Sequence, residues 1–185
     1  MNLAVAASGR AVFLDRDGVL TRALVREGQA YAPVTPAEME IDADAPAALA
    51  RLKAAGFLLV MVTNQPDVAR GITRREDVER MHATLRAALP LDACFVCYHD
   101  DRDACDCRKP LPGMLLQAAA EHGIDLAQSF MIGDRWRDID AGAGAGCRTI
   151  RIDRGYDEPA SAHMPDAQVD SLPGAADWIL EHQIR

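Results

Sequence analysis

The chain has 185 residues, a length that suits one well-packed domain and is short for two. Its hydrophobic fraction of 49% and charged fraction of 26% are those of a globular protein, which argues against disordered and fibrous classes. The 28 Asp and Glu residues outnumber the 20 Lys and Arg residues, and the net charge of -8 argues against nucleic acid as the main partner. A small anionic ligand stays possible because it needs only a few local cations.

Short apolar runs alternate along the chain with helical patterns, which is typical of a parallel α/β sheet. Strands are expected over residues 11–14, 57–62, 94–98, 129–132 and 148–152. Helices are expected over residues 44–55, 73–89, 114–122, 139–144 and 175–184. We expect Asp44 to cap the first of these helices, a capping box over residues 73–76 to start the second, and Gly123 to end the third.

These elements predict one Rossmann-like α/β domain over residues 1–185, with a parallel sheet flanked by helices. Its core spans about residues 11–152, and residues 153–185 form a C-terminal extension with a closing helix. The stretch 153–173 is polar, contains proline and shows no clear element.

No targeting or membrane segment stands out in the sequence. Residues 1–10 lack the basic start and unbroken apolar run of a secretory leader, because Ser8, Gly9 and Arg10 interrupt the apolar residues. No other stretch approaches the roughly 20 apolar residues that a membrane span requires. We therefore expect a monomeric, cytoplasmic protein with no membrane partner.

Polar side chains follow three of the predicted strands, at the points where the strands end. The carboxyl ends of parallel strands meet at one edge of a sheet, where ligands bind in open α/β folds. A further basic group lies between the second and third of these sites in the sequence. The four groups are Asp15-Arg16-Asp17-Gly18, Thr63-Asn64-Gln65, Arg108-Lys109-Pro110, and Gly133-Asp134 with Asp138.

This set of side chains suits phosphoryl transfer. A carboxylate such as Asp15 can attack phosphorus and form an acyl phosphate, which splits one difficult hydrolysis into two easier steps. Two anions repel each other, so a magnesium ion on Asp15 and Asp134 and the charge of Lys109 would be needed to neutralise them. Asp17 is the candidate acid and base, and Thr63 offers a hydroxyl to the phosphate.

The order of these motifs resembles the haloacid dehalogenase superfamily of phosphatases, over about residues 11–152. Its pattern of DxDG(T/V), a Thr or Ser, a Lys, and GD with a further acid is matched by Asp15-Arg16-Asp17-Gly18-Val19, Thr63, Lys109, and Gly133-Asp134 with Asp138. The resemblance implies that Asp15 is the nucleophile, that Asp17 is the acid/base and a magnesium ligand through its main-chain carbonyl, and that Asp134 is a magnesium ligand. The role of the acid matching Asp138 varies in the superfamily.

Members of this superfamily often carry a cap domain after the first or the second motif. Here residues 19–57 and 64–96 each have room for little more than a loop and one helix. We therefore expect no large cap domain, and an open site whose loops select the substrate.

Three of the five cysteines crowd into eleven residues, with a histidine among them. Cys97, His99, Cys105 and Cys107 would make a closed, tetrahedral, structural zinc site. The alternative is three reduced cysteines in a loop beside a chance histidine. A subgroup of the superfamily, which includes heptose bisphosphate and histidinol phosphatases, carries a similar CxH…CxCRKP pattern. That resemblance favours zinc, which would pin the loop beside Lys109.

Two loops resemble the branch of the superfamily that removes the 7-phosphate from D-glycero-D-manno-heptose 1,7-bisphosphate. The sequence running from Thr63-Asn64-Gln65 to Ala69-Arg70-Gly71 matches TNQxxxARG, and the sequence after Cys107 matches CRKPxPGMLL. The resemblance implies that Asn64, Arg70 and Arg108 bind substrate, with the arginines on the sugar or its second phosphate. Arginine binds phosphate bidentately, which suits a sugar bisphosphate.

Departures from that branch keep other interpretations open. Val19 and Tyr98 replace its more common Thr and Pro, and the short interval between His99 and Cys105 resembles histidinol phosphatase. One alternative is therefore a phosphatase for histidinol phosphate or another small phosphosugar. A second is a non-catalytic, zinc-stabilised interaction module, although a protein without activity would have no reason to keep the catalytic carboxylates and lysine.

Overall fold

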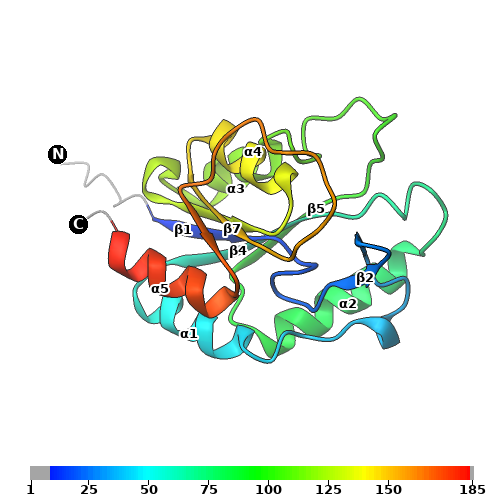
Figure 1. The fold of residues 1–185 in the computed structure, drawn as a ribbon, viewed down its shortest axis with the longest axis horizontal. Coiled ribbons are helices and arrows are strands. Elements are labelled where there is room, and N and C mark those ends of the chain that lie inside the picture. The colour runs from blue at the N-terminus through cyan, green and yellow to red at the C-terminus, as the bar shows by residue number, and fades with distance from the viewer. Residues whose placement is uncertain (1–8, 184–185) are drawn as a thin grey trace, which may run out of the picture.

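The structure is a computed structural model that describes residues 9–183, so residues 1–8 and the predicted helix end at Ile184 lie outside the described part. A six-stranded sheet in the order β5-β4-β1-β6-β7-β8 runs through its middle, and every neighbouring pair is parallel (Figure 1). The strands are β1 (Ala11–Leu14), β4 (Leu58–Asn64), β5 (Ala93–Cys97), β6 (Phe130–Gly133), β7 (Arg148–Ile152) and β8 (Ala167–Val169).

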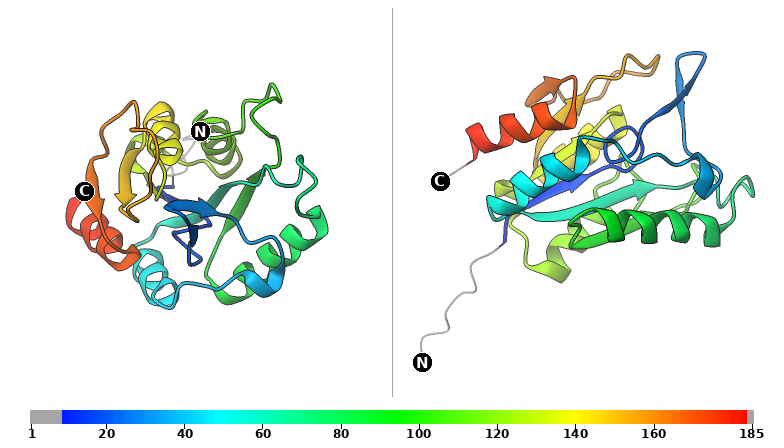
Figure 2. Two further views of the ribbon diagram at one scale, coloured as in Figure 1. Left: turned by 45° about the vertical axis from the view of Figure 1, so that its right-hand side comes forward. Right: turned by 90° about the horizontal axis from the view of Figure 1, so that it is seen from below.

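Helices cover both faces of this sheet. They are α1 (Ala45–Ala54), α2 (Arg75–Ala88), α3 (Gly113–His122), α4 (Trp136–Ala145) and α5 (Leu172–His182). Helices α1, α2 and α5 lie on one face and α3 and α4 on the other, which gives three layers (Figures 1 and 2). The predicted Rossmann-like fold with a parallel sheet is confirmed.

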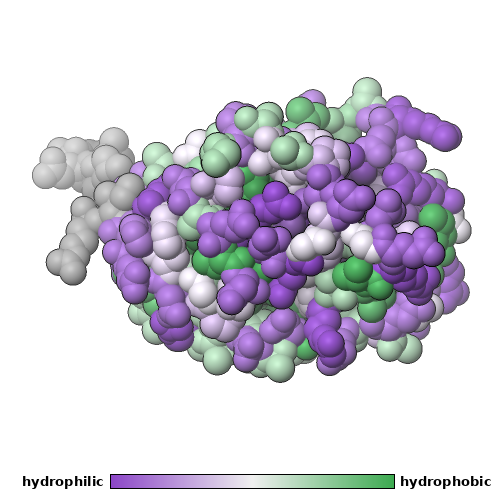
Figure 3. All heavy atoms as spheres, viewed as in Figure 1, coloured by the Kyte–Doolittle hydropathy of each residue, from purple (hydrophilic) through white to green (hydrophobic). Residues whose placement is uncertain are grey.

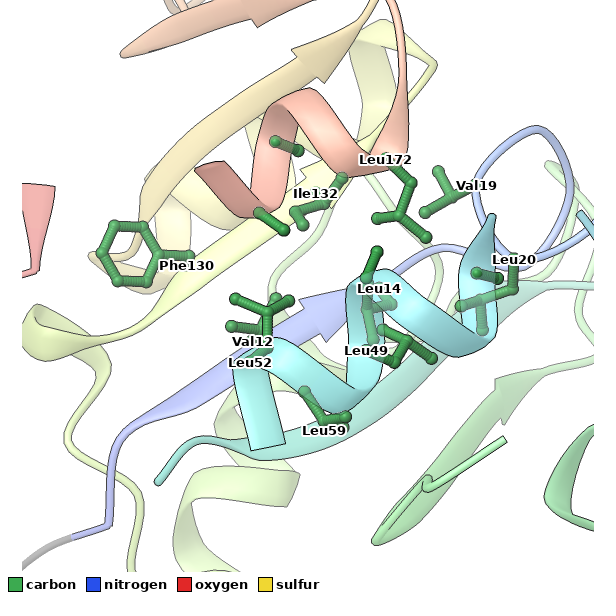
Figure 4. Close-up of a cluster of buried hydrophobic side chains, with 14 of the residues drawn as sticks. Val12, Leu14, Val19, Leu20, Leu49, Leu52, Leu59, Phe130, Ile132 and Leu172 are labelled. Atoms are coloured by element: carbon green, nitrogen blue, oxygen red, sulfur yellow. The ribbon is translucent and has the colours of Figure 1, made fainter. Parts of the chain in front are cut away.

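The core forms because alternate residues of each central strand point to opposite faces of the sheet. Figure 4 shows Leu49 and Leu52 of α1 and Leu172 of α5 gathered around Val12 and Leu14 of β1. The intervening β1 residues pack on the opposite face with residues of α3 and α4, in a cluster that includes Ala11, Phe13, Met114, Leu115 and Ala141. Both layers of helices therefore hold β1 rigidly at the centre.

Three short strands escaped prediction. Strands β2 (Leu24–Arg26) and β3 (Gln29–Tyr31) form an antiparallel hairpin, and β8 lies in the stretch where no element was expected. Three residues are too few to establish a period of two. The hairpin turn is formed by Glu27 and Gly28 with φ of 51° and 77°, a combination typical of tight two-residue turns.

Of two predicted helix N-caps, one is wrong and the other is right in position only. The Thr73 hydroxyl donates a hydrogen bond to the main-chain oxygen of Val34 at 2.7 Å, and Arg74 is the N-cap residue of α2. Asp44 does precede α1, but within residues 9–183 its side chain accepts no hydrogen bond from the helix. Gly123 ends α3 as predicted.

The chain order places the sheet's crevice beside β1. From β1 the chain builds β4 and β5 on one side, and then crosses to build β6, β7 and β8 on the other. Such a reversal opens a crevice at the carboxyl ends of the strands around it. Figure 2 shows the hairpin of β2 and β3 projecting beyond this end of the sheet.

The visible surface is mostly polar. Hydrophilic side chains predominate on the face shown in Figure 3, and the apolar areas between them are small and separate. Among the described residues, no helix combines the length and apolar character needed to cross a bilayer.

Candidate active site

A pocket of about 590 Å³ opens at the carboxyl ends of β1, β4 and β6. Asp15 follows β1 directly, Thr63 and Asn64 end β4, and Asp134 follows β6. All four residues line the pocket, together with Asp17, Lys109 and Asp138. The structure therefore brings the four sequence motifs to one place.

Lys109 lies at the floor of this pocket and is 2% exposed. Its Nζ donates to Asp15 Oδ1 at 2.8 Å and to the main-chain oxygen of Val62 at 2.8 Å, and it pairs with Asp138 Oδ1 at 2.6 Å. Burial alone would lower the pKa of Lys109, but the charges of Asp138 and Asp15 outweigh it and raise this pKa. The lysine therefore stays charged beside the Asp15 carboxylate.

Three carboxylates crowd this floor. Asp15, Asp134 and Asp138 each offer an oxygen within 4.8 Å of the others. Burial raises the pKa of Asp15 to about 6, and the charges of Asp138 and Asp17 act in the same direction while Lys109 opposes them. Burial and the charge of Asp15 also raise the pKa of Asp134. One lysine does not neutralise this cluster, so it favours a further cation.

Asp134 has an oxygen that suits such a cation. Tyr156 donates its hydroxyl to Oδ2 of Asp134 at 2.7 Å. Oδ1 of the same carboxylate is buried and finds no hydrogen-bond partner within residues 9–183. An unpaired buried carboxylate oxygen is costly, and magnesium prefers oxygen ligands. The residues present therefore fit a magnesium ion.

Gly18 allows this close arrangement of the two acidic loops. Its φ is 82°, and a Cβ atom added there would lie 1.8 Å from Asp134 Oδ2 and 3.0 Å from the Tyr156 hydroxyl. Any side chain would push the Asp134 carboxylate away. The glycine of the DxDG motif thus serves the approach of the loop after β6 as well as the turn after β1.

Asp138 has two structural roles. Its Oδ2 accepts a hydrogen bond from the main-chain nitrogen of Arg135 at 3.0 Å, at the start of α4, and its Oδ1 pairs with Lys109. One side chain therefore stabilises the N-terminus of α4 and pairs with the lysine at the floor of the pocket.

Asp17 is held by a buried network that sequence reasoning missed. The guanidinium of Arg16 is fully buried and donates to both oxygens of Asp17, through Nε at 3.0 Å and Nη2 at 2.8 Å. Gln65 also donates to Asp17, at 3.2 Å, and Thr21 donates to it at 3.2 Å. A charged residue between two acids at a strand end was the available signal, since Arg16 cannot be buried without such partners.

His82 completes this network from α2. Its Nε2 lies 3.2 Å from Arg16 Nη1. Burial and the charge of Arg16 lower the pKa of His82 to about 4, so the ring is neutral at pH 7 and can accept from the guanidinium. Nothing in the local sequence pairs His82 with a residue 66 positions away.

Thr63 and Asn64 both line the pocket but differ in their partners. The Thr63 hydroxyl accepts a hydrogen bond from Gln65 Nε2 at 3.0 Å. The Asn64 side chain donates to the main-chain oxygen of Lys109 at 2.9 Å and accepts from its main-chain nitrogen at 3.1 Å. In this arrangement Asn64 fixes the backbone that carries Lys109.

The outer rim of the pocket, which we define as Arg70, Arg108, Arg137 and Asp101, is a cluster of ion pairs on loops and on α4. Asp101 lies 3.5 Å from Arg70, 2.9 Å from Arg108 and 3.4 Å from Arg137. The Asp101 side chain is 52% exposed. Arg137 escaped prediction because a helical arginine without a motif reads as solvated surface.

The four predicted zinc ligands converge at the end of β5, which supplies Cys97, and in the loop that follows it. Their ligand atoms lie within 4.8 Å of one another. Cys97 Sγ is 3.6 Å from His99 Nδ1 and 3.9 Å from Cys105 Sγ, and His99 Nδ1 is 3.3 Å from Cys107 Sγ. A tetrahedral ion with Zn–S bonds of about 2.3 Å places its sulfurs about 3.8 Å apart, so this cluster can hold zinc.

Comparison with known proteins agrees with this geometry. Residues 106–175 match the family described as HAD-hydrolase-like. The D-glycero-beta-D-manno-heptose-1,7-bisphosphate 7-phosphatase of Bordetella bronchiseptica is 35% identical over 182 residues, covering 92% of this chain and 97% of that protein. The protein of the same name from Yersinia pestis is 37% identical, with 92% and 89% covered.

Solved structures give the same result. The crystal structure of D,D-heptose 1,7-bisphosphate phosphatase from B. bronchiseptica, complexed with magnesium and phosphate, aligns with a TM-score of 0.75 and 29% identity over 93% of this chain and 98% of that one. The equivalent protein from Burkholderia thailandensis aligns with a TM-score of 0.62 and 27% identity over 92% and 98%. By its sequence, fold and site, this chain belongs to the HAD-like hydrolase family and is a phosphatase.

Proposed function

We propose that this phosphatase removes the 7-phosphate from D-glycero-D-manno-heptose 1,7-bisphosphate through a phosphorylated Asp15. The observation that carries the chemistry is the contact of Asp15 with charged Lys109 at the floor of the pocket. The names of the relatives, which cover nearly the whole chain, support the substrate.

The reaction needs two carboxylates in different roles. An Asp15 oxygen attacks phosphorus and the bond to the sugar oxygen breaks, while Asp17 gives that oxygen a proton. Asp17 then takes a proton from water, whose oxygen attacks the phosphorus and releases Asp15 with inorganic phosphate. Arg16 fixes the position of the Asp17 carboxylate from the buried side of the pocket.

Magnesium is the proposed cofactor, held by the carboxylates of Asp15 and Asp134 and the main-chain carbonyl of Asp17. The orphan Oδ1 of Asp134 supports this assignment. When bound, the ion would offset negative charge on the phosphoryl group. Lys109 contributes a second, fixed positive charge beside Asp15.

Zinc is the proposed occupant of the cluster of Cys97, His99, Cys105 and Cys107, with a structural role. The loop that carries these ligands also bears Arg108, whose Nη1 donates to the main-chain oxygen of His99 at 3.3 Å. Zinc would therefore fix the loop that positions Arg108 and Lys109, without taking part in the chemistry.

The second phosphate of the substrate is proposed to bind Arg70 and Arg108 at the outer rim. Both arginines are paired with Asp101 in this structure, and Arg70 also with Asp100 at 3.2 Å. The pair of Arg70 with Asp101 is exposed to solvent, and exposed pairs contribute only about 0–1 kcal/mol. A phosphate with more charge and more acceptor oxygens can therefore displace Asp101 from Arg70 at little cost.

Phosphate release from a panel of substrates tests the assignment. Heptose 1,7-bisphosphate should be hydrolysed with a higher kcat/KM than heptose 7-phosphate and histidinol phosphate. The short interval between His99 and Cys105 makes histidinol phosphate the informative competitor. Preference for histidinol phosphate would overturn the heptose assignment and leave the chemistry at Asp15 in place.

A further inference from the structure

The segment after β7, residues 153–158, lies against the acidic loops of the pocket. It is the start of the orange coil that follows β7 in Figure 1. Arg154 donates two hydrogen bonds to the main-chain oxygen of Gly18, from Nε at 3.0 Å and from Nη2 at 2.8 Å. Tyr156 donates to Asp134 Oδ2 at 2.7 Å and lines the pocket. One short segment therefore contacts the loops after both β1 and β6.

The hydrogen bond from Tyr156 gives the two carboxylate oxygens of Asp134 different surroundings. Oδ2 accepts the hydroxyl, whereas Oδ1 is buried and lacks a partner in the described part of the chain. A carboxylate fixed through one oxygen cannot rotate freely, so its other oxygen keeps one direction. The crowding of Gly18 against the same Oδ2 limits this rotation further.

The segment is itself anchored, which makes the position of Tyr156 a built feature. Glu158, whose side chain is 3% exposed, accepts hydrogen bonds from Arg135 Nε at 2.6 Å, from the main-chain nitrogen of Trp136 at 3.0 Å and from Arg151 Nη2 at 3.2 Å. Glu158 thus ties the segment to the first turn of α4 and to β7. The guanidinium of Arg135 also lies 5.8 Å from the centre of the Tyr156 ring.

We propose that Tyr156 is a positioning residue for the metal site, which holds the Asp134 carboxylate so that Oδ1 is directed to magnesium. This inference rests on the proposed role of Asp134 as a magnesium ligand. Residues that orient metal ligands by hydrogen bonds commonly change metal affinity when they are replaced. The hydroxyl is the essential group, because the ring alone would leave Oδ2 without its donor.

The test is metal affinity, measured without turnover. Mn²⁺, which suits the same oxygen ligands as Mg²⁺, would be titrated into the zinc-loaded protein and its free fraction followed by electron paramagnetic resonance. Tyr156→Phe should weaken Mn²⁺ binding by about 10–100-fold. Tyr98→Phe is the matched control, because it removes a hydroxyl that donates to Glu79 outside the pocket, and its Mn²⁺ affinity should equal that of the native protein.

Two further measurements separate this inference from the assignment on which it rests. Without Mn²⁺, the melting temperatures of Tyr156→Phe and Tyr98→Phe should be similar, which would show that a lower affinity does not come from a damaged fold. Asp134→Asn should abolish binding at this site. If Asp134→Asn fails to bind Mn²⁺ while Tyr156→Phe binds as the native protein does, the role of Tyr156 is refuted and the metal assignment stands. If Asp134→Asn binds normally, both are refuted.

Discussion

The floor of the pocket and its outer rim handle charge in different ways. At the floor, Asp15, Lys109 and Asp138 are almost fully buried and directly paired. Asp15 follows the central strand β1, Asp138 lies in α4, and the Asn64 side chain holds the backbone of Lys109. At the rim, Arg70 and Asp101 are partly exposed and lie on loops. Removing one partner of a buried ion pair strongly destabilises the protein, whereas exposed ion pairs exchange partners at little cost in free energy.

This difference assigns separate tasks to the two regions. The floor keeps a fixed arrangement of charges, as catalysis by preorganised groups requires. In the proposed function, the rim arginines would release Asp101 and bind an anion of the substrate instead. Changes at the floor should therefore affect every substrate alike, whereas changes at the rim should distinguish between substrates.

Replacing the nucleophile should have the largest effect. Asp15→Asn should lower kcat by a factor on the order of 10⁴ or more for every phosphorylated substrate, because the amide has no charge with which to attack phosphorus. Phosphate release by protein freshly purified and checked by mass spectrometry for deamidation measures the effect. Near-native turnover by intact Asp15→Asn would end the covalent mechanism.

His82 should make the network behind the floor sensitive to acid. Its pKa falls from 6.5 in the unfolded chain to about 4 in the folded protein. Below pH 6.5 the unfolded state therefore binds a proton that the folded state rejects until about pH 4, so stability is lost as the pH falls through this window. The full loss corresponds to about 3 kcal/mol.

His82→Gln is the matched variant, because glutamine can still accept from Arg16 but does not titrate. Urea unfolding at several pH values from 7 to 4 should show that the native protein loses more stability than the variant, with the difference growing below pH 6.5. Parallel curves for the two proteins would show that His82 is not buried in the neutral form.

Loss of the bound zinc should affect both regions, because the loop that would bind it carries Arg108 at the rim and Lys109 at the floor. Cys107→Ser should remove about one bound zinc per chain by elemental analysis. It should lower the melting temperature by roughly 5–10 °C, as a loss of about 2–3 kcal/mol does in a chain of this size. Cys94→Ser, in β5 and outside the cluster, is the control. Unchanged activity and melting in zinc-free Cys107→Ser would refute the structural role.

Removing one rim arginine should have the smallest and most selective effect. Arg70→Ala should lower kcat/KM for heptose 1,7-bisphosphate about ten- to a hundredfold, because a hydrogen bond to a charged group contributes about 1.5–3 kcal/mol. The effect on the 7-monophosphate should be much smaller. Arg102→Ala, in the loop after β5 and outside the pocket, should change neither rate. An equal loss on both substrates would show general damage.

Residues that act through a local motif could be predicted from the sequence. Asp15, Thr63 and Asp134 each follow or end a strand, so the parallel sheet alone brings them together. The same reasoning placed Leu49 and Leu52 on the buried face of α1. In these cases local periodicity and the direction of the strands determine the outcome.

Residues that depend on tertiary contacts could not be predicted. Tyr156 reaches Asp134 across 22 positions and His82 reaches Arg16 across 66, with no repeating pattern to pair them. The hairpin of β2 and β3 has too few residues for a periodic signal, although its turn at Glu27 and Gly28 was a possible clue. Thr73 is the opposite case. Its local sequence predicts a helix cap, but its hydroxyl contacts the main-chain oxygen of Val34 instead.

Chemical trapping of the intermediate tests the central role of Asp15 most directly. Asp17→Asn, which should slow breakdown of the aspartyl phosphate, would be mixed with heptose 1,7-bisphosphate, quenched during turnover and treated with borohydride. Borohydride reduces an acyl phosphate to an alcohol and so converts the phosphorylated aspartate to homoserine. Mass spectrometry of the peptides should find homoserine at position 15, and only when substrate was present. Homoserine at another position, or none at all while phosphate is released, would contradict covalent catalysis by Asp15.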